Sequence, residues 1–454
     1  DAIPDSWLDT LAASIKHRGP DGQGRFRDRA TRPDGTVVDV ALVHRRLSII
    51  DHAGGHQPMV HARAGDESDL VAVAFNGCIY NHRELRAELD ACGHVFETDH
   101  SDTEDLIHGW REWGLHIQDH LDGMYAFLLW DRRTGQLAVA RDMAGEKPVF
   151  SSWVGARFVV SSSPAGLTHL LHTAGNGTID GPGNEIAFAR PADSEWPAQC
   201  FQLKPRHWRV YPREPKRGGD HVPPNALRSR RWRPLPDRDG STGLRLGFIP
   251  TNEKLVESAI TSRFEADVPL GVFLSGGLDS ALIAAIAHKH RPDLRAFTVR
   301  MPPSEAGPDY DESGQAAETA AASGVQHTIL DCEPNPAEDL VHLIEQLGLP
   351  FGDSSLLPTY WVSKAAREHI KVALSGDGGD ELCGGYRRHT IAPVLNRLRW
   401  LLRLIPARLL DQRTPGSRST YFARLAAAAR FGGYPELLAI FPTPDMRKLA
   451  PMFH

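Results

Sequence analysis

Two short stretches in the second half of the chain place small and acidic residues directly after an apolar run. The first, VFLSGGLDS, spans residues 272–280. Gly276 and Gly277 allow the backbone to approach a bulky anion and to adopt positive φ angles. A helix that begins near Asp279 directs its free N–H groups and the positive end of its dipole at the same anion. The stretch therefore predicts a loop that holds phosphate.

Asp279 decides between two interpretations of this loop. An aspartate inside a phosphate loop repels the phosphate unless a cation lies between them, so Asp279 fits the role of a magnesium ligand. Alternatively, the loop is an ordinary turn in which Asp279 caps the helix. The loop lacks the Walker lysine of GxxxxGK[ST] and the GxGxxG pattern of dinucleotide-binding folds, which argues against both of these standard sites.

The second stretch, VALSGDGGDELCGGY, spans residues 372–386 and favours the metal-site interpretation. It also runs from an apolar segment into Ser-Gly, and then places Asp377, Asp380 and Glu381 within one glycine-rich turn. Three carboxylates this close repel one another and raise one another's pKa unless a cation compensates. Two anion-type loops that both carry acids predict one site for a nucleoside triphosphate and its metal ion.

The elements around these loops alternate between strand and helix. The apolar patterns predict strands over residues 268–274, 294–299, 326–331 and 370–375, and helices over 252–264, 279–290, 312–323, 337–347 and 358–369. Alternation of this kind forms parallel βαβ units and a doubly wound sheet. In such a sheet, ligands bind beyond the carboxyl ends of the strands, which is where both loops lie.

The first half of the chain mixes strands and helices in a different order. Strands are predicted over 36–50, 71–80, 124–131 and 136–142 and as a pair around 149–163, and helices over 82–93 and 101–114. Ser101 and Glu104 have the spacing of a capping box. Residues 173–240 are rich in proline, glycine and charge, which predicts a linker region with one short strand at 201–211.

Length and composition bound the class of protein. A chain of 454 residues exceeds one ordinary core and predicts two or three domains. With 41% hydrophobic and 24% charged residues, it has the composition of a soluble globular protein. A net charge of −6 indicates neither nucleic acid nor a membrane as a partner. Five scattered cysteines without a CxxC pair argue against a disulfide framework and favour a cytoplasmic location.

The sequence contains no uninterrupted apolar run long enough to span a membrane. The nearest candidate, residues 396–413, carries arginines at helical spacing. It predicts an amphipathic helix packed on the protein, with a helix lying on a membrane surface as the alternative.

Both loops resemble signatures of a known enzyme family. SGGLDS is similar to the pyrophosphate loop of the ATP pyrophosphatase (PP-loop) ligases, and SGDGGDELCGGY is similar to the companion signature of the glutamine-dependent asparagine synthetases. Four pieces of the first half resemble class II glutamine amidotransferases and occur in the family's order: HRGPDG (17–22), HRRLSIID (44–51), NGCIYNH (76–82) and SDTE (101–104).

This resemblance implies an Ntn-hydrolase-like αββα sandwich followed by a doubly wound parallel sheet of the PP-loop type. It implies a glutaminase domain over residues 1–205, a linker over 206–245 and an ATP-dependent synthetase domain over 246–454. In the implied reaction, ATP adenylates the aspartate side-chain carboxylate, and ammonia released from glutamine then displaces AMP to give asparagine. ATP and Mg²⁺ are the implied cofactors, the other partners are the small molecules glutamine and aspartate, and a homodimer stays open.

Family positions also imply a role for individual residues. Arg46 would hold the α-carboxylate of glutamine and Asp102 its ammonium group, while the Asn76 amide and the Gly77 N–H would stabilise the oxyanion. In the second half, Asp279 and Asp380 would bind the metal, and Asp377 would act as acid or base near the attacking ammonia. The implied ATP-binding positions are Phe273, Ser275, Gly276, Gly277, Asp279, Ser280, Val299, Ser375 and Gly376.

Three departures from the family pattern bear on activity. The family nucleophile is an N-terminal cysteine, and none lies near the start of this sequence. This predicts a truncated copy or, alternatively, a member without glutaminase activity. Cys78 stands where most members have a glutamate, and its mid-strand position predicts a packed structural thiol. A pyrophosphate-binding lysine that the family carries further along its chain has no match here.

Two other functions stay open beside asparagine synthesis. Relatives with the SGDGGDE form of the signature also amidate other carboxylates, on a cell-surface sugar or a peptide. From a different class of protein, the chain would be a catalytically inactive nucleotide-binding relic.

Overall fold

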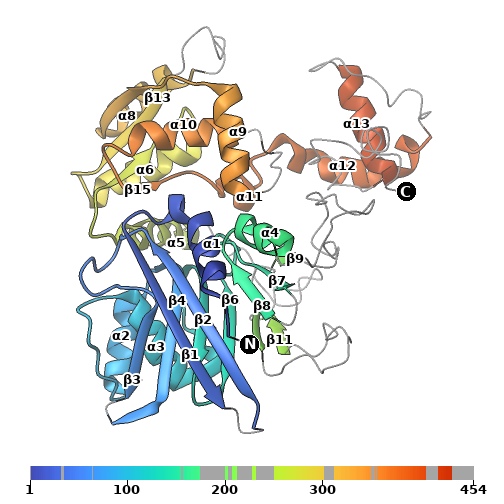
Figure 1. The fold of residues 1–454 in the computed structure, drawn as a ribbon. Helices are drawn as coiled ribbons and strands as arrows, with labels where there is room; N and C mark the ends of the chain where they lie inside the picture. The colour runs from blue at the N-terminus through green and yellow to red at the C-terminus, as the bar shows by residue number, and fades with distance from the viewer. Residues whose placement is uncertain are drawn as a thin grey trace.

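The computed structural model describes residues 2–31, 35–63, 65–154, 157–173, 200–202, 207–211, 228–231, 250–300, 311–348, 353, 355–404 and 418–431. Figure 1 shows an N-terminal body, blue to green, below a C-terminal body, yellow to orange. Helices α12 (Arg387–Leu402) and α13 (Arg418–Phe431) project to one side of the C-terminal body.

Three antiparallel sheets build the N-terminal body. The first pairs β1 (Gly22–Thr31) with β2 (Val37–Arg46). The second has six strands in the order β11-β10-β6-β5-β4-β3, namely β3 (Met59–Arg63), β4 (Asp66–Ile79), β5 (Gly123–Asp131), β6 (Gln136–Arg141), β10 (His207–Tyr211) and β11 (Arg228–Arg231). The third has the order β8-β7-β9, with β7 (Phe150–Val154), β8 (Arg157–Ser161) and β9 (Cys200–Gln202).

Helices cover the two outer faces of these sheets. Helices α2 (His82–Ala91) and α3 (Asp102–Trp113) pack on one face of the six-stranded sheet, and the short 3₁₀ helix η2 (Gly114–Asp119) follows α3. The opposite face of the sheet packs on the β1-β2 pair, through Ala72 and Trp130 against Leu42. Beyond the third sheet lie α1 (Asp5–Ser14), with the 3₁₀ turn η1 (Lys16–Arg18), and α4 (Pro164–Thr173). The layer order helix, sheet, sheet, helix confirms the αββα sandwich.

The central strand β4 shows why the strands of this sheet are so apolar. Residues 70–75 are all buried, without the alternation of a half-exposed strand. Because helices cover one face of the sheet and a second sheet covers the other, side chains on both faces of β4 leave water. The run VAVAF is therefore the sequence signature of a strand at the centre of a sandwich.

A four-stranded parallel sheet forms the centre of the C-terminal body. Its order is β14-β13-β12-β15, with β12 (Leu270–Phe273), β13 (Arg295–Arg300), β14 (Gln326–Asp331) and β15 (Val372–Leu374). The chain moves outward from β12 to β14 and then returns to the other side of β12, so the direction of winding reverses between β12 and β15. A reversal of this kind opens a crevice at the carboxyl ends of the two strands.

Helices lie on both faces of this sheet. Helices α6 (Leu278–His290) and α8 (Ser313–Ser323) bury Ala284 and Ala316 against Val272 and Leu274 on one face. On the other face, α10 (Leu356–Ala366) buries Ala366 against Phe297. Further helices among the described residues of this body are α5 (Pro250–Thr261), the 3₁₀ turn η4 (Ser262–Phe264), α9 (Pro336–Leu347) and α11 (Gly379–Cys383). This arrangement confirms the doubly wound parallel sheet.

Some predicted elements need correction. The strand predicted at 201–211 is two strands in different sheets, β9 and β10. β10 and β11 extend the six-stranded sheet next to β6, so the segment predicted as a linker over 206–245 contributes two strands to the N-terminal body. The boundaries at 205 and 245 otherwise remain predictions.

The capping box predicted at Ser101 is also wrong. Ser101 is the residue before α3, but its side chain makes no capping hydrogen bond. The Glu104 carboxylate instead accepts hydrogen bonds from the backbone N–H groups of Glu97 and Thr98, at 2.7 and 2.8 Å. Glu104 thus fastens the loop before α3 to the helix.

The segment that leads into β12 joins the two bodies. The Asp267 carboxylate accepts hydrogen bonds from the Asp51 N–H, at 2.7 Å, and from His100 Nε2, at 2.6 Å. The Asp267 N–H donates to the Ile49 carbonyl at 2.9 Å. Two residues earlier, Glu265 pairs with Arg83 of α2 at 2.6 Å. The chain between η4 and β12 is therefore held by the N-terminal body just before it enters the parallel sheet.

The helix predicted over 396–413 begins earlier, because α12 runs from Arg387 to Leu402, and its predicted end lies outside the described residues. Leu395 and Leu402 of α12 pack on Ala428 and Ala429 of α13. Among the described helices, none has the length and apolar character that a membrane span requires.

Candidate functional site

A cavity of about 330 Å³ lies inside the N-terminal body. Arg46, Asn76, Gly77 and Asp102, the four residues predicted to bind glutamine, all line it. They come from the end of β2, from β4 and from the start of α3. The fold thus brings together side chains that are up to 56 positions apart in the sequence, the difference between 46 and 102.

Arg46 is fixed by backbone carbonyls and not by an acidic partner. Its guanidinium donates to the carbonyls of Ile50 and His52, at 3.0 Å each, and to the carbonyl of Asp51, at 2.5 Å. The side chain is 8% exposed. A Cβ atom at Gly55 would collide with this guanidinium, so the turn after β2 needs glycine there. Arg46 therefore keeps its positive charge at the cavity in one orientation, which suits a carboxylate ligand.

Asp102 is the acidic group of the cavity. It is the first residue of α3, is 5% exposed, and accepts a hydrogen bond from the Ile79 N–H at 3.1 Å. Burial raises the pKa of Asp102 to about 7, although backbone hydrogen bonds and the Arg46 charge act in the opposite direction. A bound ammonium group would favour the ionised carboxylate again. A buried arginine and a buried aspartate in one cavity match the two charges of an amino acid.

Asn76 and Gly77 lie on β4 opposite Ala126 and Tyr125 of β5. A Cβ atom at Gly77 would collide with the Met124 carbonyl, so only glycine permits this approach of the two strands. The next residue, Cys78, is 5% exposed, and burial raises the pKa of its thiol far above the ordinary value. This agrees with the prediction of a packed structural thiol. No cysteine is among the residues that line the cavity.

The sequence interpretation assigned no role to two cations of the same cavity. Arg18 of HRGPDG and Lys147 both line it, and burial lowers the pKa of each. Arg18 donates to the Ser162 carbonyl at 2.6 Å. Arg18 belongs to the HRGPDG stretch, but only the fold shows that Arg18 and Lys147 share a cavity with Arg46.

The second candidate site lies at the carboxyl ends of β12 and β15, where the two glycine loops meet. A Cβ atom at Gly379 would collide with the Asp279 carboxylate, and one at Gly376 would lie 3.0 Å from the Ser280 nitrogen. The loop after β15 therefore touches the start of α6. This contact places SGGLDS and SGDGGDE at one site, as the reversal of the sheet order requires.

The loop after β12 is organised by its own serines. The Ser280 hydroxyl accepts the Ser275 N–H at 3.1 Å and lies 2.9 Å from the Ser275 hydroxyl. The Ser275 hydroxyl in turn accepts the Gly277 N–H at 3.1 Å. These bonds shape a tight turn directly before α6, whose N-terminus favours anions.

Three details of this loop differ from the sequence interpretation. Gly277 has φ −82°, so positive φ is not the reason for glycine at that position. Gly277, and not Asp279, is the residue that precedes α6, so the alternative of Asp279 as helix cap is wrong. The Gly276 N–H donates to the Glu312 carboxylate at 2.9 Å, and Glu312 was not predicted. No local signal marks Glu312, because it lies 36 residues further along the chain.

The loop after β15 carries its acids toward solvent. Asp377 and Glu381 are exposed, and Asp380 is half-buried. The Ser375 hydroxyl donates to the Asp377 carboxylate at 2.9 Å, and the Tyr386 hydroxyl donates to Glu381 at 2.8 Å. In the part of the chain that the structure describes, these acids and Asp279 form no group of three ligand atoms within 4.8 Å. Two carboxylates and phosphate oxygens form the usual ligand set of Mg²⁺ beside a nucleotide.

Phe273 and Val299, predicted to lie near the adenosine, are both half-buried. Phe273 ends β12 and packs toward Phe297 and Ile370, on the face of the sheet covered by α10. Val299 lies on β13 opposite Leu330 of β14. Neither position contradicts the prediction, and neither establishes a contact with a nucleotide.

The sequence matches two protein-family models. Residues 3–208 match the glutamine amidotransferase domain, and residues 251–446 match asparagine synthase. Among curated proteins, asparagine synthetase [glutamine-hydrolyzing] 1 of Bacillus subtilis is 32% identical over 383 residues, which is 82% of this chain and 54% of the relative. Asparagine synthetase [glutamine-hydrolyzing] 1 of Arabidopsis thaliana is 29% identical, over 84% of this chain and 58% of the relative. Asparagine synthetase [glutamine-hydrolyzing] 3 of Bacillus subtilis is 28% identical, over 87% of this chain and 62% of the relative.

These matches cover only part of each relative's length. The chain spans about half the length of the curated relatives it matches most strongly. Among solved structures, glutamine phosphoribosylpyrophosphate amidotransferase from B. subtilis covers 73% of this chain and 67% of its own, with 15% identity. Its TM-score of 0.35 is too low to carry an argument. By its two domain matches and its curated relatives, the chain is similar in both halves to the glutamine-hydrolysing asparagine synthetases.

Proposed function

We propose that the chain acts as an asparagine synthetase that uses ATP and glutamine. The contact between the two glycine loops carries this proposal, because it combines an anion-binding helix start with two acidic side chains at the switch point of a parallel sheet. In the proposed reaction, an oxygen of the aspartate side-chain carboxylate attacks the α-phosphorus of ATP, and pyrophosphate leaves. Ammonia then attacks the acyl carbon, and AMP leaves with the former carboxylate oxygen.

In the proposed synthetase site, the N-terminal end of α6 and the turn from Ser275 to Ser280 hold the pyrophosphate. Asp279 and Asp380 bind Mg²⁺, which offsets the repulsion between carboxylates and phosphates. Asp377 accepts or donates the proton of the attacking ammonia. Glu312 must leave the Gly276 N–H when phosphate arrives, since both are anionic acceptors for one donor. Phe273, Val299, Ser375 and Gly376 complete the nucleotide site.

In the proposed glutaminase site, Arg46 binds the α-carboxylate of glutamine, and Asp102 binds its ammonium group. The Asn76 amide and the Gly77 N–H stabilise the oxyanion of the tetrahedral intermediate. Cys78 is unsuited as the nucleophile of this step, because its thiol is buried and the pKa of the thiol is raised. We also propose that the chain is cytoplasmic and forms a homodimer.

The test is an assay of the full chain with MgATP and aspartate, with ammonium or glutamine as nitrogen donor. We expect pyrophosphate and asparagine in equal amounts. Asp279→Asn abolishes both products, while Asp293→Asn, an exposed aspartate past the end of α6, leaves them unchanged. Pyrophosphate without asparagine, formed with a sugar or peptide carboxylate, would assign a different acceptor. Absence of pyrophosphate with every donor and acceptor would reject the ligase and favour a nucleotide-binding relic.

A further inference from the structure

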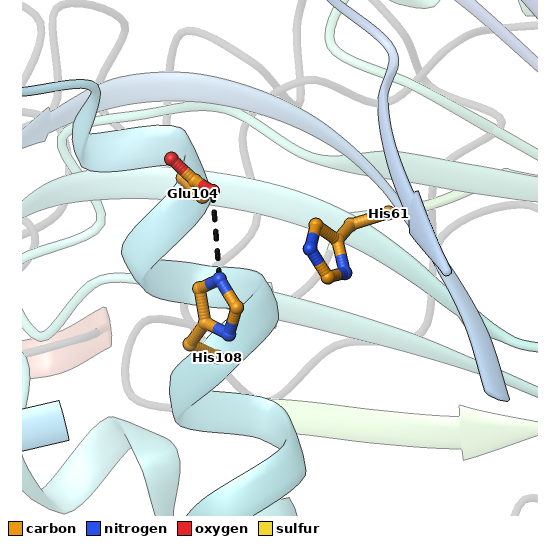
Figure 2. A group of neighbouring side chains, drawn as sticks. All are labelled: His61, Glu104 and His108. Atoms are coloured by element: carbon orange, nitrogen blue, oxygen red, sulfur yellow. Dashed lines mark ion pairs between the residues drawn. The ribbon is translucent and has the colours of Figure 1, made fainter. Parts of the chain in front are cut away.

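Two histidines and a glutamate gather at one edge of the N-terminal body, and none of the three is among the described residues that line the cavity. His61 lies on the edge strand β3, and Glu104 and His108 lie one turn apart on α3. Figure 2 shows the three side chains pointing toward a common space. One nitrogen or oxygen atom of each lies within 4.8 Å of the others. Within the described ranges, no other group of three such side chains is this close.

Two members of the group are removed from water. His108 is 2% exposed and Glu104 is 1% exposed, while the side chain of His61 is 13% exposed. His108 Nε2 lies 3.5 Å from the nearer oxygen of Glu104, as the dashed line in Figure 2 marks. This nitrogen is buried and has no hydrogen-bond partner. A buried polar atom without a partner costs about 1–3 kcal/mol, so it calls for an explanation.

The neighbours of His108 determine which of its nitrogens carries the proton. His94 Nε2 lies 3.1 Å from the Glu112 carboxylate, which can only accept, so a neutral His94 ring carries its proton on Nε2. His94 Nδ1 is then an acceptor, and it lies 3.2 Å from His108 Nδ1, which must donate. His108 Nε2 therefore presents a lone pair toward Glu104. A metal-binding histidine usually donates the proton of one ring nitrogen to a neighbouring acceptor and presents a lone pair on the other nitrogen.

Two acceptors facing each other leave room for a cation. The His108 lone pair and the Glu104 carboxylate repel each other across 3.5 Å unless a positive centre lies between them. Charged groups beside the cluster include Arg86, at 3.7 Å from Glu104, and Glu97, at 3.5 Å from His61 Nε2.

We propose that His61, Glu104 and His108 form a zinc site that fastens β3 to α3. Two imidazoles and a carboxylate are a ligand set that suits Zn²⁺, and water or the Glu97 carboxylate would complete a tetrahedron. The ligand atoms must move closer together, because Zn–N and Zn–O bonds are only about 2.0–2.2 Å long. The edge strand allows this movement, since the β3-β4 register is irregular between His61 and Arg63.

Arg111 opposes the proposed site and gives it a specific test. Arg111 Nη1 donates to His61 Nδ1 at 2.6 Å, whereas a metal on Nε2 requires the proton on Nδ1. Binding must therefore break this hydrogen bond. Arg111 retains its contacts with the carbonyls of His61 and Asp69, at 3.0 and 2.7 Å. Glutamine at position 111 would offer His61 an acceptor, so Arg111→Gln should bind zinc more tightly than the native chain.

The experiment measures zinc binding to the full chain by calorimetry without nucleotide, and the absorption spectrum after cobalt(II) is bound instead. We expect one ion per chain and the visible bands of tetrahedral cobalt. His61→Gln should abolish both signals. His116→Gln, a matched change at an exposed histidine on η2, should leave both unchanged. His94→Leu removes the partner of His108 Nδ1 and should weaken binding by about 10-fold.

Two results would overturn the proposal. One is absence of zinc binding by the native chain and by Arg111→Gln. The other is zinc binding that persists in a folded His61→Gln variant, since the ion would then be bound elsewhere. Circular dichroism establishes whether each variant is folded. If His61→Gln does not fold, tighter binding by Arg111→Gln supports the site and unchanged or weaker binding rejects it.

Discussion

The cavity of the N-terminal body and the glycine loops of the C-terminal body differ in how completely their polar groups are already arranged. In the cavity, Arg46 and Asp102 are almost fully buried, and carbonyl and N–H groups of the surrounding chain hold both. At the loops, Asp377 is exposed and Asp279 and Asp380 are half-buried. Ser275, Ser280 and Glu312 occupy the donors and acceptors that a phosphate would use.

The difference corresponds to the ligands that each site is proposed to bind. A small amino acid with two opposite charges gains most from a rigid, buried pair of charges that needs no rearrangement on binding. In the proposed C-terminal site, a nucleoside triphosphate would bring its own cation, and its phosphates would replace the internal hydrogen bonds of the loop. The polar groups of the N-terminal cavity are already held in place, whereas on our proposal the nucleotide would complete the C-terminal site.

The largest expected effect comes from inserting a methyl group where the two glycine loops touch. Gly379→Ala places a Cβ atom against the Asp279 carboxylate, so we expect pyrophosphate formation to fall by at least about 100-fold, in the range of a removed electrostatic contact. Gly314→Ala is the matched control, because a Cβ atom there meets nothing within 4 Å. Initial rates with MgATP, aspartate and ammonium measure the effect. Equal rates for the two variants would show that the loops do not share a site.

Arg46→Met tests the preorganised site. Loss of a buried charge that binds a carboxylate costs about 3 kcal/mol, so kcat/KM for glutamine should fall roughly 100-fold. The rate with ammonium should stay within about twofold, because the synthetase site does not contain Arg46. An equal loss with both nitrogen donors would mean that Arg46 acts on the fold and not on glutamine.

The pH dependence of glutamine binding sharpens the same comparison. Because the pKa of Asp102 is about 7, the empty site is increasingly protonated below neutrality, and glutamine should bind more weakly as the pH falls from 8 to 6. Binding of MgATP should not share this profile. Calorimetry from pH 6 to pH 8 measures the affinities for glutamine and for MgATP. A glutamine affinity that does not change with pH would contradict the role of Asp102.

Ionisation of Asp102 is expected to favour glutamine binding, but it lowers the free energy of unfolding. Its folded-state pKa exceeds the unfolded value of 3.8, so the native chain holds the proton more tightly, and the free energy of unfolding decreases as the pH rises from about 4 to about 7. Asp102→Asn removes this penalty and should stabilise the chain at pH 8 by up to about 4 kcal/mol, because the pKa difference is about three units and one pKa unit equals about 1.4 kcal/mol. Denaturant titrations at pH 5 and pH 8 measure it. An increase that is equal at both pH values would rule out ionisation as the cause.

The smallest expected effect concerns the connection between the bodies. The Asp267 carboxylate raises the pKa of His100, so this pair stabilises the fold fully below the unfolded pKa of 6.5, and the contribution is lost as the pH rises through the higher folded value. Since both side chains are partly exposed, Asp267→Asn should cost at most about 1 kcal/mol at pH 6 and nothing at pH 9. Asp99→Asn, which alters the more exposed partner of His100, should cost less. Melting temperatures at both pH values test the order.

Much of the fold was predictable because the sequence pattern is local. The parallel strands and their helices follow from apolar runs and helical spacing, and the two glycine loops fall at strand ends in the sequence itself. The strands β1 and β3 were not predicted, because β1 alternates arginines and glycines with few apolar residues and β3 is a short edge strand. The strands β10 and β11 were assigned to a linker, since proline, glycine and charge surround them.

The sequence by itself determined which residues are predicted to carry chemistry: Arg46, Asn76, Gly77 and Asp102 in one set of motifs, and the glycine loops in another. Only the tertiary structure decided how those groups are held, because their partners are distant in the chain. The Asp279 carboxylate meets Gly379, the Gly276 N–H meets Glu312, and His61 meets His108 through pairings of strands and helices that no local pattern encodes. The pKa of Asp102 likewise follows from burial, which is a property of the packed sandwich and not of the SDTE motif.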